Sequence, residues 1–127
     1  MKHFGCKNCG NLIAMINNSG KTVSCCNKSM DEVVPKFDDS GKEKHAPQIH
    51  VENGTVRITV GPADNMHPME NEHGIAWVCL VTTGGTQRKM LLPNGKSEAI
   101  FHIGKDERVV SAFAYCNLHG LWVTECK

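Results

Sequence analysis

The feature that most constrains this chain is the placement of its seven cysteines, four near the start and three far downstream. The first group comprises Cys6, Cys9, Cys25 and Cys26, and the second comprises Cys79, Cys116 and Cys126. So many cysteines in 127 residues serve either as disulfides or as metal ligands, and the odd number favours ligands in a reducing compartment. A disulfide scaffold would be expected only in an exported protein.

The composition is that of a folded protein with small partners. Hydrophobic residues make up 40% of the chain and charged residues 21%, both close to the averages of globular proteins. The net charge of +1 indicates no basic face for nucleic acid or anionic lipid. No apolar run is long enough to span a membrane, and residues 1–9 lack the apolar stretch of a signal peptide. We therefore expect a cytoplasmic protein with no nucleic-acid and no membrane partner.

A polar segment, Asp38–Lys44, separates the two cysteine groups and ends shortly before Pro47. We place the boundary near Pro35 to Gly41, which gives a first domain of residues 1–37 and a second of residues 38–127. The first is too short to build a hydrophobic core of its own.

Downstream of this boundary, short runs of β-forming residues alternate with turn residues. Asn53-Gly54 is a hairpin signal, and Pro93-Asn94-Gly95 marks another turn. The expected strands are Gln48–Val51, Thr55–Val60, Ile75–Thr83, Gln87–Leu92, Glu98–Ile103, Arg108–Cys116 and Leu121–Cys126. No stretch has a convincing apolar period of 3.6 residues, so the pattern predicts an all-β chain: a small metal-binding unit followed by a seven-stranded immunoglobulin-like β-sandwich.

The first cysteine group has the spacing of a metal site. Cys6 and Cys9 form a knuckle in which two thiolates grip one ion, and Gly10 permits the turn. The adjacent Cys25 and Cys26 are unusual, because a second C-x2-C pair would be the common arrangement. Tetrahedral sulfurs lie roughly 3.8 Å apart, as do neighbouring Cα atoms, so both can bind one ion in a distorted tetrahedron. Iron and zinc both accept four thiolates, and a structural zinc staple is one interpretation.

Three further motifs carry four histidines and one cysteine at expected loops or strand ends. They are E-K-H-A-P at residues 43–47, H-P-M-E-N-E-H at residues 67–73 and C-N-L-H-G at residues 116–120. A β-sandwich gathers such loops into one shallow site. The C-x2-H spacing resembles half a metal site, and the middle motif would add two imidazoles from one loop. The sequence therefore predicts a second metal site.

Together these motifs resemble the desulfoferrodoxins, the two-iron form of the superoxide reductases, over nearly the whole chain. That family's desulforedoxin-like N-terminal unit has C-x2-C followed by a vicinal Cys-Cys, as the first cysteine group does, and there the metal is iron. Its motifs E-K-H-x-P, H-P-M-E-x-x-H and C-N-x-H-G match the three motifs above. Gly74 departs from the pattern, because an aromatic residue commonly follows the second histidine of the loop. We expect a more open pocket wall there.

The resemblance implies two iron ions per chain and a ligand set for each. The ligands implied are Cys6, Cys9, Cys25 and Cys26 for the first ion, and His45, His67, His73 and His119 with axial Cys116 for the second. It also implies an open position where superoxide is reduced to hydrogen peroxide without release of dioxygen. Glu43 and Lys44 would lie at the open side, Lys44 attracting superoxide and Glu43 binding the ferric form. A rubredoxin-like electron donor and a homodimer are further implications.

Two other functions compete with this one. A non-enzymatic electron-transfer iron protein would gain nothing from an open coordination position. A zinc-stapled β-sandwich that binds proteins would leave the four histidines unexplained.

The residues outside the motifs are given structural interpretations. His3, His50 and His102 are expected to be structural or exposed, Cys79 to be buried, Cys126 to be a free thiol, and Trp77 and Trp122 to be core residues or pocket walls.

Overall fold

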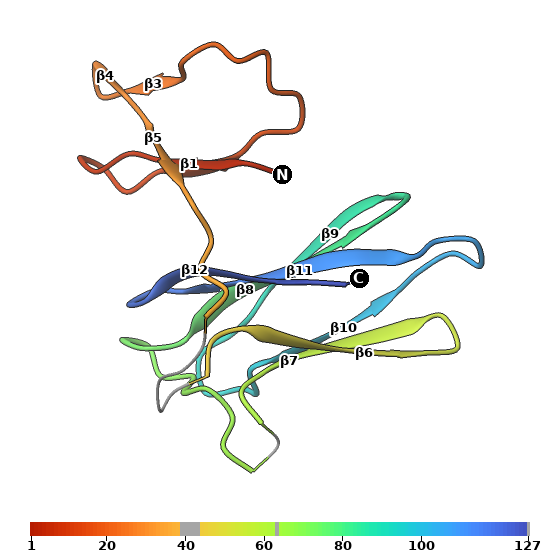
Figure 1. Ribbon diagram of the computed structural model, residues 1–127. Helices are drawn as coiled ribbons and strands as arrows, with labels where there is room; N and C mark the ends of the chain where they lie inside the picture. Colours follow the sequence, from red (N-terminus) through yellow and green to blue (C-terminus); the bar gives the residue numbers. More distant parts are fainter. Residues whose placement is uncertain (39–43, 63, 127) are drawn as a thin grey trace. The chain divides into compact units, whose positions relative to one another are not determined.

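The computed structural model describes residues 1–38, 44–62 and 64–126 (Figure 1). Over these ranges the chain forms twelve β-strands and no helix, so none could span a membrane, and the predicted all-β class is confirmed. The chain divides into two compact units, Met1–Val34 and Pro35–Lys127. We keep a domain boundary after residue 37 as a prediction, three residues beyond this geometric division.

The first unit is built from very short strands. A three-stranded sheet has the order β2-β1-β5, and a separate two-stranded hairpin pairs β3 with β4. The strands are β1 (His3–Gly5), β2 (Leu12–Ala14), β3 (Ser24–Cys25), β4 (Lys28–Ser29) and β5 (Asp31–Val33). The buried residues of this unit are His3, Cys6 and Met30. Three side chains are far too few for a hydrophobic core that could stabilise the unit.

The second unit is a β-sandwich of seven strands in two antiparallel sheets, as predicted. One sheet has the order β10-β7-β6 and the other has the order β12-β11-β8-β9. The strands are β6 (Pro47–Glu52), β7 (Thr55–Val60), β8 (Ile75–Thr82), β9 (Gly85–Met90), β10 (Glu98–His102), β11 (Val109–Cys116) and β12 (Gly120–Glu125). Each lies within two residues of an expected strand at either end.

The core lies between the two sheets. Val56 and Ile58 of β7, with Phe101 of β10, face Val78 and Leu80 of β8, and all are at most 1% exposed. Alternate residues of β7 and β10 point inward, which explains the period-2 pattern of the sequence. Burying each such side chain stabilises the fold by about 1.5–3 kcal/mol.

The β6–β7 hairpin shows how a turn fixes the register of one sheet. Asn53 and Gly54 both have positive φ, 49° and 79°, and Glu52 pairs with Thr55 across them. Two consecutive left-handed residues are the signature of a type I′ turn, and Asn-Gly is the pair that adopts it most readily. Because side chains alternate faces, this register also puts Val56 and Ile58 inside.

Side chains of β9 cover the outer edge of β10. The Gln87 amide donates a hydrogen bond to the main-chain oxygen of His102 at 2.9 Å. The Lys89 ammonium donates to the main-chain oxygen of Ile100 and lies 5.4 Å from the centre of the Phe101 ring. β9 and β10 are edge strands of different sheets, so these two side chains link the sheets on that side of the sandwich.

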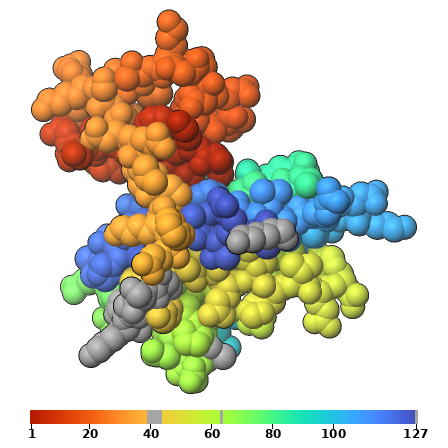
Figure 2. Space-filling model, viewed as in Figure 1, coloured from red at the N-terminus to blue at the C-terminus, as the bar shows by residue number. Residues whose placement is uncertain are grey.

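The start of the second unit is attached to β12. The Lys36 amide donates to the oxygen of Leu121, and the Val123 amide donates to the oxygen of Lys36, both at 2.9 Å. These bonds form a short parallel bridge between Lys36 and Trp122. In Figure 2 the light-orange segment that begins this unit lies against the blue C-terminal region.

Candidate metal centres

The four cysteines of the first group, here called the cysteine site, come from two turns of the first unit. Cys6 follows β1, and the Gly10 amide returns to the Cys6 oxygen at 2.8 Å with Gly10 at φ 83°. Cys26 and Asn27 have φ values of 54° and 60° and form the two-residue turn between β3 and β4. Cys25 ends β3, and Cys26 therefore opens a left-handed turn, which lets two adjacent thiols face one point.

The sulfur atoms of the cysteine site have the spacing that one ion requires. All four lie within 4.8 Å of one another, Cys9 Sγ is 3.6 Å from Cys25 Sγ, and Cys25 Sγ is 4.0 Å from Cys26 Sγ. A tetrahedral metal with sulfur ligands at about 2.3 Å places them roughly 3.8 Å apart. The residues therefore fit a four-thiolate metal.

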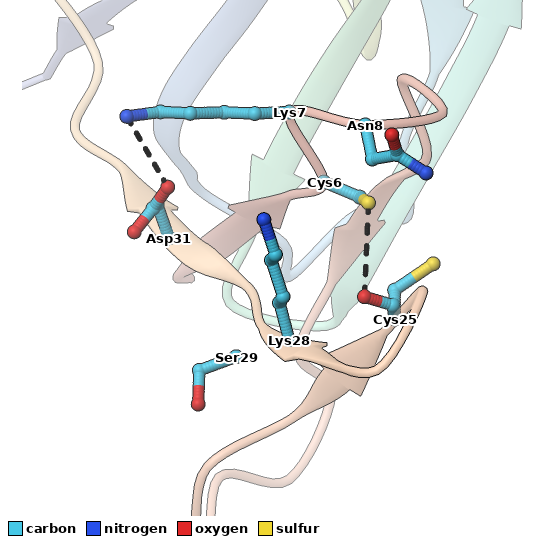
Figure 3. Close-up of a pocket in the computed structure, with 7 residues that line it drawn as sticks. All are labelled: Cys6, Lys7, Asn8, Cys25, Lys28, Ser29 and Asp31. Atoms are coloured by element: carbon cyan, nitrogen blue, oxygen red, sulfur yellow. Dashed lines mark hydrogen bonds and ion pairs between the residues drawn. The ribbon is translucent and has the colours of Figure 1, made fainter.

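Polar groups surround these sulfurs. The Asn11 side-chain amide lies 3.5 Å from Cys25 Sγ, in position to donate a hydrogen bond. Figure 3 shows Cys6 Sγ directed at the main-chain oxygen of Cys25, and Lys7 paired with Asp31 beside them. The backbone N–H of Cys9 lowers the pKa of Cys6 to about 7, whereas the Cys9 thiol raises the pKa of Cys25 to about 12. A bound cation would replace the thiol protons that these sulfurs share.

The second set, here called the histidine site, gathers residues from four parts of the sandwich. His45 precedes β6, His67 and His73 lie in the β7–β8 loop, Cys116 ends β11, and His119 lies in the turn before β12. Each offers one ligand atom, and these atoms lie within 4.8 Å of one another. The sequence separated these residues by up to 74 positions, and the fold brings all five together.

Close backbone packing shapes the β7–β8 loop. Gly61 has φ 86°, and a Cβ there would lie 2.7 Å from the His67 nitrogen, so only glycine fits. The His67 amide donates to the Val60 oxygen at 2.9 Å, which turns the loop back onto β7. The Glu70 amide donates to the His73 oxygen at 2.9 Å and closes a small turn that holds the second histidine.

Hydrogen bonding selects which nitrogen of His67 faces the site. Its Nδ1 donates to the oxygen of Pro68 at 2.8 Å, so Nδ1 carries the proton. Nε2 keeps its lone pair and points to Cys116 Sγ at 3.7 Å. His119 directs Nδ1 to the same sulfur at 3.7 Å and to His45 Nε2 at 3.1 Å. Imidazole nitrogens converging on a thiolate form a suitable donor set for iron.

Burial is uneven across the histidine site. Cys116 is fully buried, and His45 and His67 are 6% and 4% exposed. His73 is half-buried and His119 is exposed. The thiol therefore lies on the protected side with His45 and His67, while His73 and His119 reach the surface.

Gly74 joins the two loops that carry most of these ligands. Its N–H donates to the Asn117 side-chain oxygen at 3.0 Å, and its oxygen accepts from the Asn117 amide at 3.1 Å. A Cβ at position 74 would lie 3.1 Å from the Glu70 oxygen, so a larger residue would displace the loop. A hollow of about 240 Å³ lies beside Gly74, lined by Met69, Asn117 and residues of β8 and β9. The open space beside Gly74 therefore borders the β7–β8 loop, and none of the five ligands of the histidine site lines it.

Several other predicted residues can be located. Lys44 is half-buried directly before His45, while Glu43 lies outside the described residues. Cys79 is fully buried, as expected, and Cys126 is an exposed free thiol. His3 is buried, while His50 and His102 are exposed.

Trp122 is a wall of the histidine site. Its indole stacks on the His45 ring, with centroids 4.7 Å apart and planes inclined by 14°. Trp77 instead stacks on Tyr115 at 5.5 Å. A pocket wall was one of the two places expected for Trp122, but its stack on His45 was not predicted, although Trp122 lies only three residues after His119. The hydrogen bonds of Asn11 and Asn117 were not predicted either, although Asn11 directly follows Gly10 and Asn117 lies inside the C-N-L-H-G motif.

The fold and the two donor sets define a class: β-sandwich proteins with one mononuclear site of four imidazoles and a thiolate, here with an added four-thiolate unit. The sequence profile of the desulfoferrodoxins matches residues 37–125. The chain belongs to the desulfoferrodoxin family.

Three similar proteins match this chain over nearly all of their own length. A desulfoferrodoxin homologue from Archaeoglobus fulgidus is 38% identical over 122 residues, which cover 96% of this chain and 94% of the homologue. The crystal structure of the superoxide reductase from Treponema pallidum has a TM-score of 0.78 and 36% identity, covering 98% of both chains. A one-iron superoxide reductase from Giardia intestinalis has a TM-score of 0.58 and 32% identity, covering 99% of that chain but 68% of this one.

Proposed function

We propose that this protein is a superoxide reductase. It adds one electron and two protons to superoxide, which gives hydrogen peroxide and no dioxygen. The observation that carries this proposal is the convergence of His45, His67, His73, His119 and Cys116, with ligand atoms within 4.8 Å. Five protein donors leave a six-coordinate metal one position for a small ligand, and an electron carrier has no use for such a position.

The histidine site would hold one of two iron ions, and the four thiolates of the cysteine site would hold the other. Iron in its ferrous state would supply the single electron, and the Cys116 thiolate would increase its tendency to donate it. Burial of Cys116 protects that thiolate from water, and the Pro68 oxygen keeps His67 in the tautomer that can bind.

Residues before His45 act on the substrate. Lys44 supplies a positive charge next to a ligand, which attracts the superoxide anion and favours its approach. Glu43, by family resemblance, would bind the ferric form after hydrogen peroxide has left. Both roles are part of the proposal.

The cysteine site has no free position, so it exchanges electrons and does not bind substrate. Two of its ligands, Cys9 and Cys26, are exposed, which gives an electron donor access to the sulfurs. We propose a rubredoxin-like protein as that donor, a homodimer as the assembly and the cytoplasm as the location. The net charge of +1 supports small or weakly charged partners over nucleic acid or membranes.

A metal count with a visible spectrum and a product assay tests the proposal. We expect two irons per chain, a ferric-thiolate charge-transfer band that is absent from Cys116→Ser, and hydrogen peroxide without dioxygen from superoxide. Two zincs per chain, or dioxygen as a product, would end it. If the iron can be reduced and re-oxidised but the protein consumes no superoxide, the rival interpretation, a non-enzymatic electron-transfer protein, would hold.

A further inference from the structure

We propose that Lys36 is a positioning residue of the histidine site, which holds the His119 and Trp122 side of that site and favours its ferrous state. This inference rests on the proposed function. Lys36 lies outside all three motifs and is nine positions from the nearest ligand in sequence. Only the fold brings it to the site.

Two donors meet at one carbonyl oxygen behind His119. The Lys36 ammonium donates to the His119 oxygen at 3.0 Å, and the Trp122 indole N–H donates to the same oxygen at 3.2 Å. A carbonyl accepts two hydrogen bonds, so this oxygen is fully used. The backbone of His119 is therefore fixed on both sides, although the residue lies in an exposed turn.

The same ammonium also covers the Trp122 ring, 5.5 Å from its centre. On Trp122 the His45 imidazole is stacked nearly parallel, at 4.7 Å. One lysine thus contacts the backbone of one ligand and, through an indole, supports the ring of another. A cation near the indole face is attracted by the ring quadrupole.

The attachment of Lys36 makes this arrangement firm. Its amide and its oxygen both hydrogen-bond to the β12 backbone at 2.9 Å, on either side of Trp122. The backbone is therefore fixed at the point from which the side chain reaches His119. A freely moving surface lysine would lose this contact to water and side-chain entropy.

The charge of Lys36 acts on the redox equilibrium of the site. Oxidation adds one positive charge to the metal, so a nearby fixed cation disfavours the ferric form and raises the reduction potential. Because Lys36 is exposed, salt should weaken this effect. Lys36 thus helps to keep the site in the state that can reduce superoxide.

Redox titration of the iron-loaded full-length chain tests the charge. Lys36→Met should shift the ferric/ferrous equilibrium toward ferric by roughly threefold to tenfold at low salt, a tenfold change being 59 mV for one electron. Lys36→Arg should stay within about twofold of the unchanged protein, since it keeps charge and donor. Lys105→Met is the matched control, because it also removes one lysine charge. Lys105 precedes β11, whose first residue lies roughly 23 Å from Cys116 by the rise of the strand.

A second measurement tests the contact without iron chemistry. In the zinc-loaded full-length chain with Trp77→Phe, Trp122 is the single tryptophan. Lys36→Met should lower quenching of its fluorescence by iodide and leave quenching by neutral acrylamide unchanged, because a cation concentrates iodide near the ring.

An unchanged potential in Lys36→Met, or equal iodide quenching in both proteins, would overturn the inference. A chain that binds iron but does not reduce superoxide would instead refute the proposed function, and the iodide measurement would still report on Lys36.

Discussion

The two units hold their ligands in opposite ways. The cysteine site lies in a unit whose buried residues are His3, Cys6 and Met30, and two of its four ligands are exposed. The histidine site lies at one end of a sandwich with a core cluster of twelve buried residues, and one of its ligands, Cys116, belongs to that cluster. In the first unit, metal binding must supply the stability that a hydrophobic core would otherwise give. In the second unit, a hydrophobic core already holds the ligands in place.

This difference separates what each metal does for its unit. A unit without a core depends on its metal for folding free energy, as small metal-binding domains generally do. A sandwich can keep its shape and offer a preformed donor set, so its metal is free to keep one position for chemistry. On the proposed function, the same residue type, cysteine, would stabilise the fold in one unit and adjust reactivity in the other.

Removal of the metal ions should give the largest effect, and it tests directly whether the two units differ in their dependence on metal. Chelation of the full-length chain under reducing conditions should unfold the first unit and leave the sandwich folded. Amide hydrogen exchange should show full loss of protection in β1 to β5 and retained protection in β7, β8 and β11. Added zinc should restore the first unit. Protected amides in a metal-free first unit would contradict the comparison.

Cys116→Ala should reduce the rate of superoxide reduction by a factor of about 100 or more. Even residues that only hydrogen-bond to a metal ligand change metal affinity or activity by about 10–100-fold. Pulse radiolysis measures the rate, and metal analysis should find the first iron unchanged. Cys79→Ala is the control, because Cys79 is equally buried and its strand neighbours β11. It should lower stability and keep the rate. Near-normal turnover in Cys116→Ala would refute the ligand assignment.

Lys44→Ile should slow the reaction with superoxide by roughly tenfold and weaken its dependence on ionic strength, without loss of iron. The reason is that a unit charge at about 6 Å contributes roughly 3 kcal/mol at an effective dielectric of 20, before salt screening. A salt series with Lys105→Ile as control distinguishes a local charge from net charge. An unchanged rate and salt slope would return Lys44 to a solvated loop residue.

Cys25→Ser should give the smallest change in the substrate step. It should remove or perturb the first iron, yet keep superoxide reduction within about twofold when a chemical reductant is supplied, because four thiolates leave that metal no open position. Single-turnover measurement of a pre-reduced protein isolates the step. A large loss there would make the cysteine site catalytic and end the division of labour.

Much of the sandwich could be predicted because local signals agree with its tertiary structure. Thr55–Val60 alternates apolar and polar residues, and the strand has those bounds. Asn53-Gly54 encodes its own turn through left-handed dihedral angles. The strands of the first unit could not be predicted, since two or three residues are too few to show a period.

The sequence also predicted which cysteines and histidines converge at the two candidate sites, because short motifs such as C-x2-C and C-x2-H can be recognised without knowledge of the rest of the fold. The residues that hold these ligands in position could not be predicted. Lys36 reaches the His119 oxygen across 83 positions of sequence, and no pattern in the chain marks that contact. The tautomer of His67 depends on a hydrogen bond to Pro68, which requires the loop conformation to be known.

The side chains that cover the edge of β10 have a consequence for self-association. An exposed strand edge offers unpaired backbone groups to another chain, which is a route to fibrils and domain swapping. Gln87 and Lys89 already occupy the oxygens of His102 and Ile100, and Lys89 places a charge there. Edge-to-edge pairing is therefore disfavoured at these two positions of β10, and both contacts lie within the sandwich, apart from the first unit and its metal site. Loss of the metal from the cysteine site should therefore leave this protection of β10 in place.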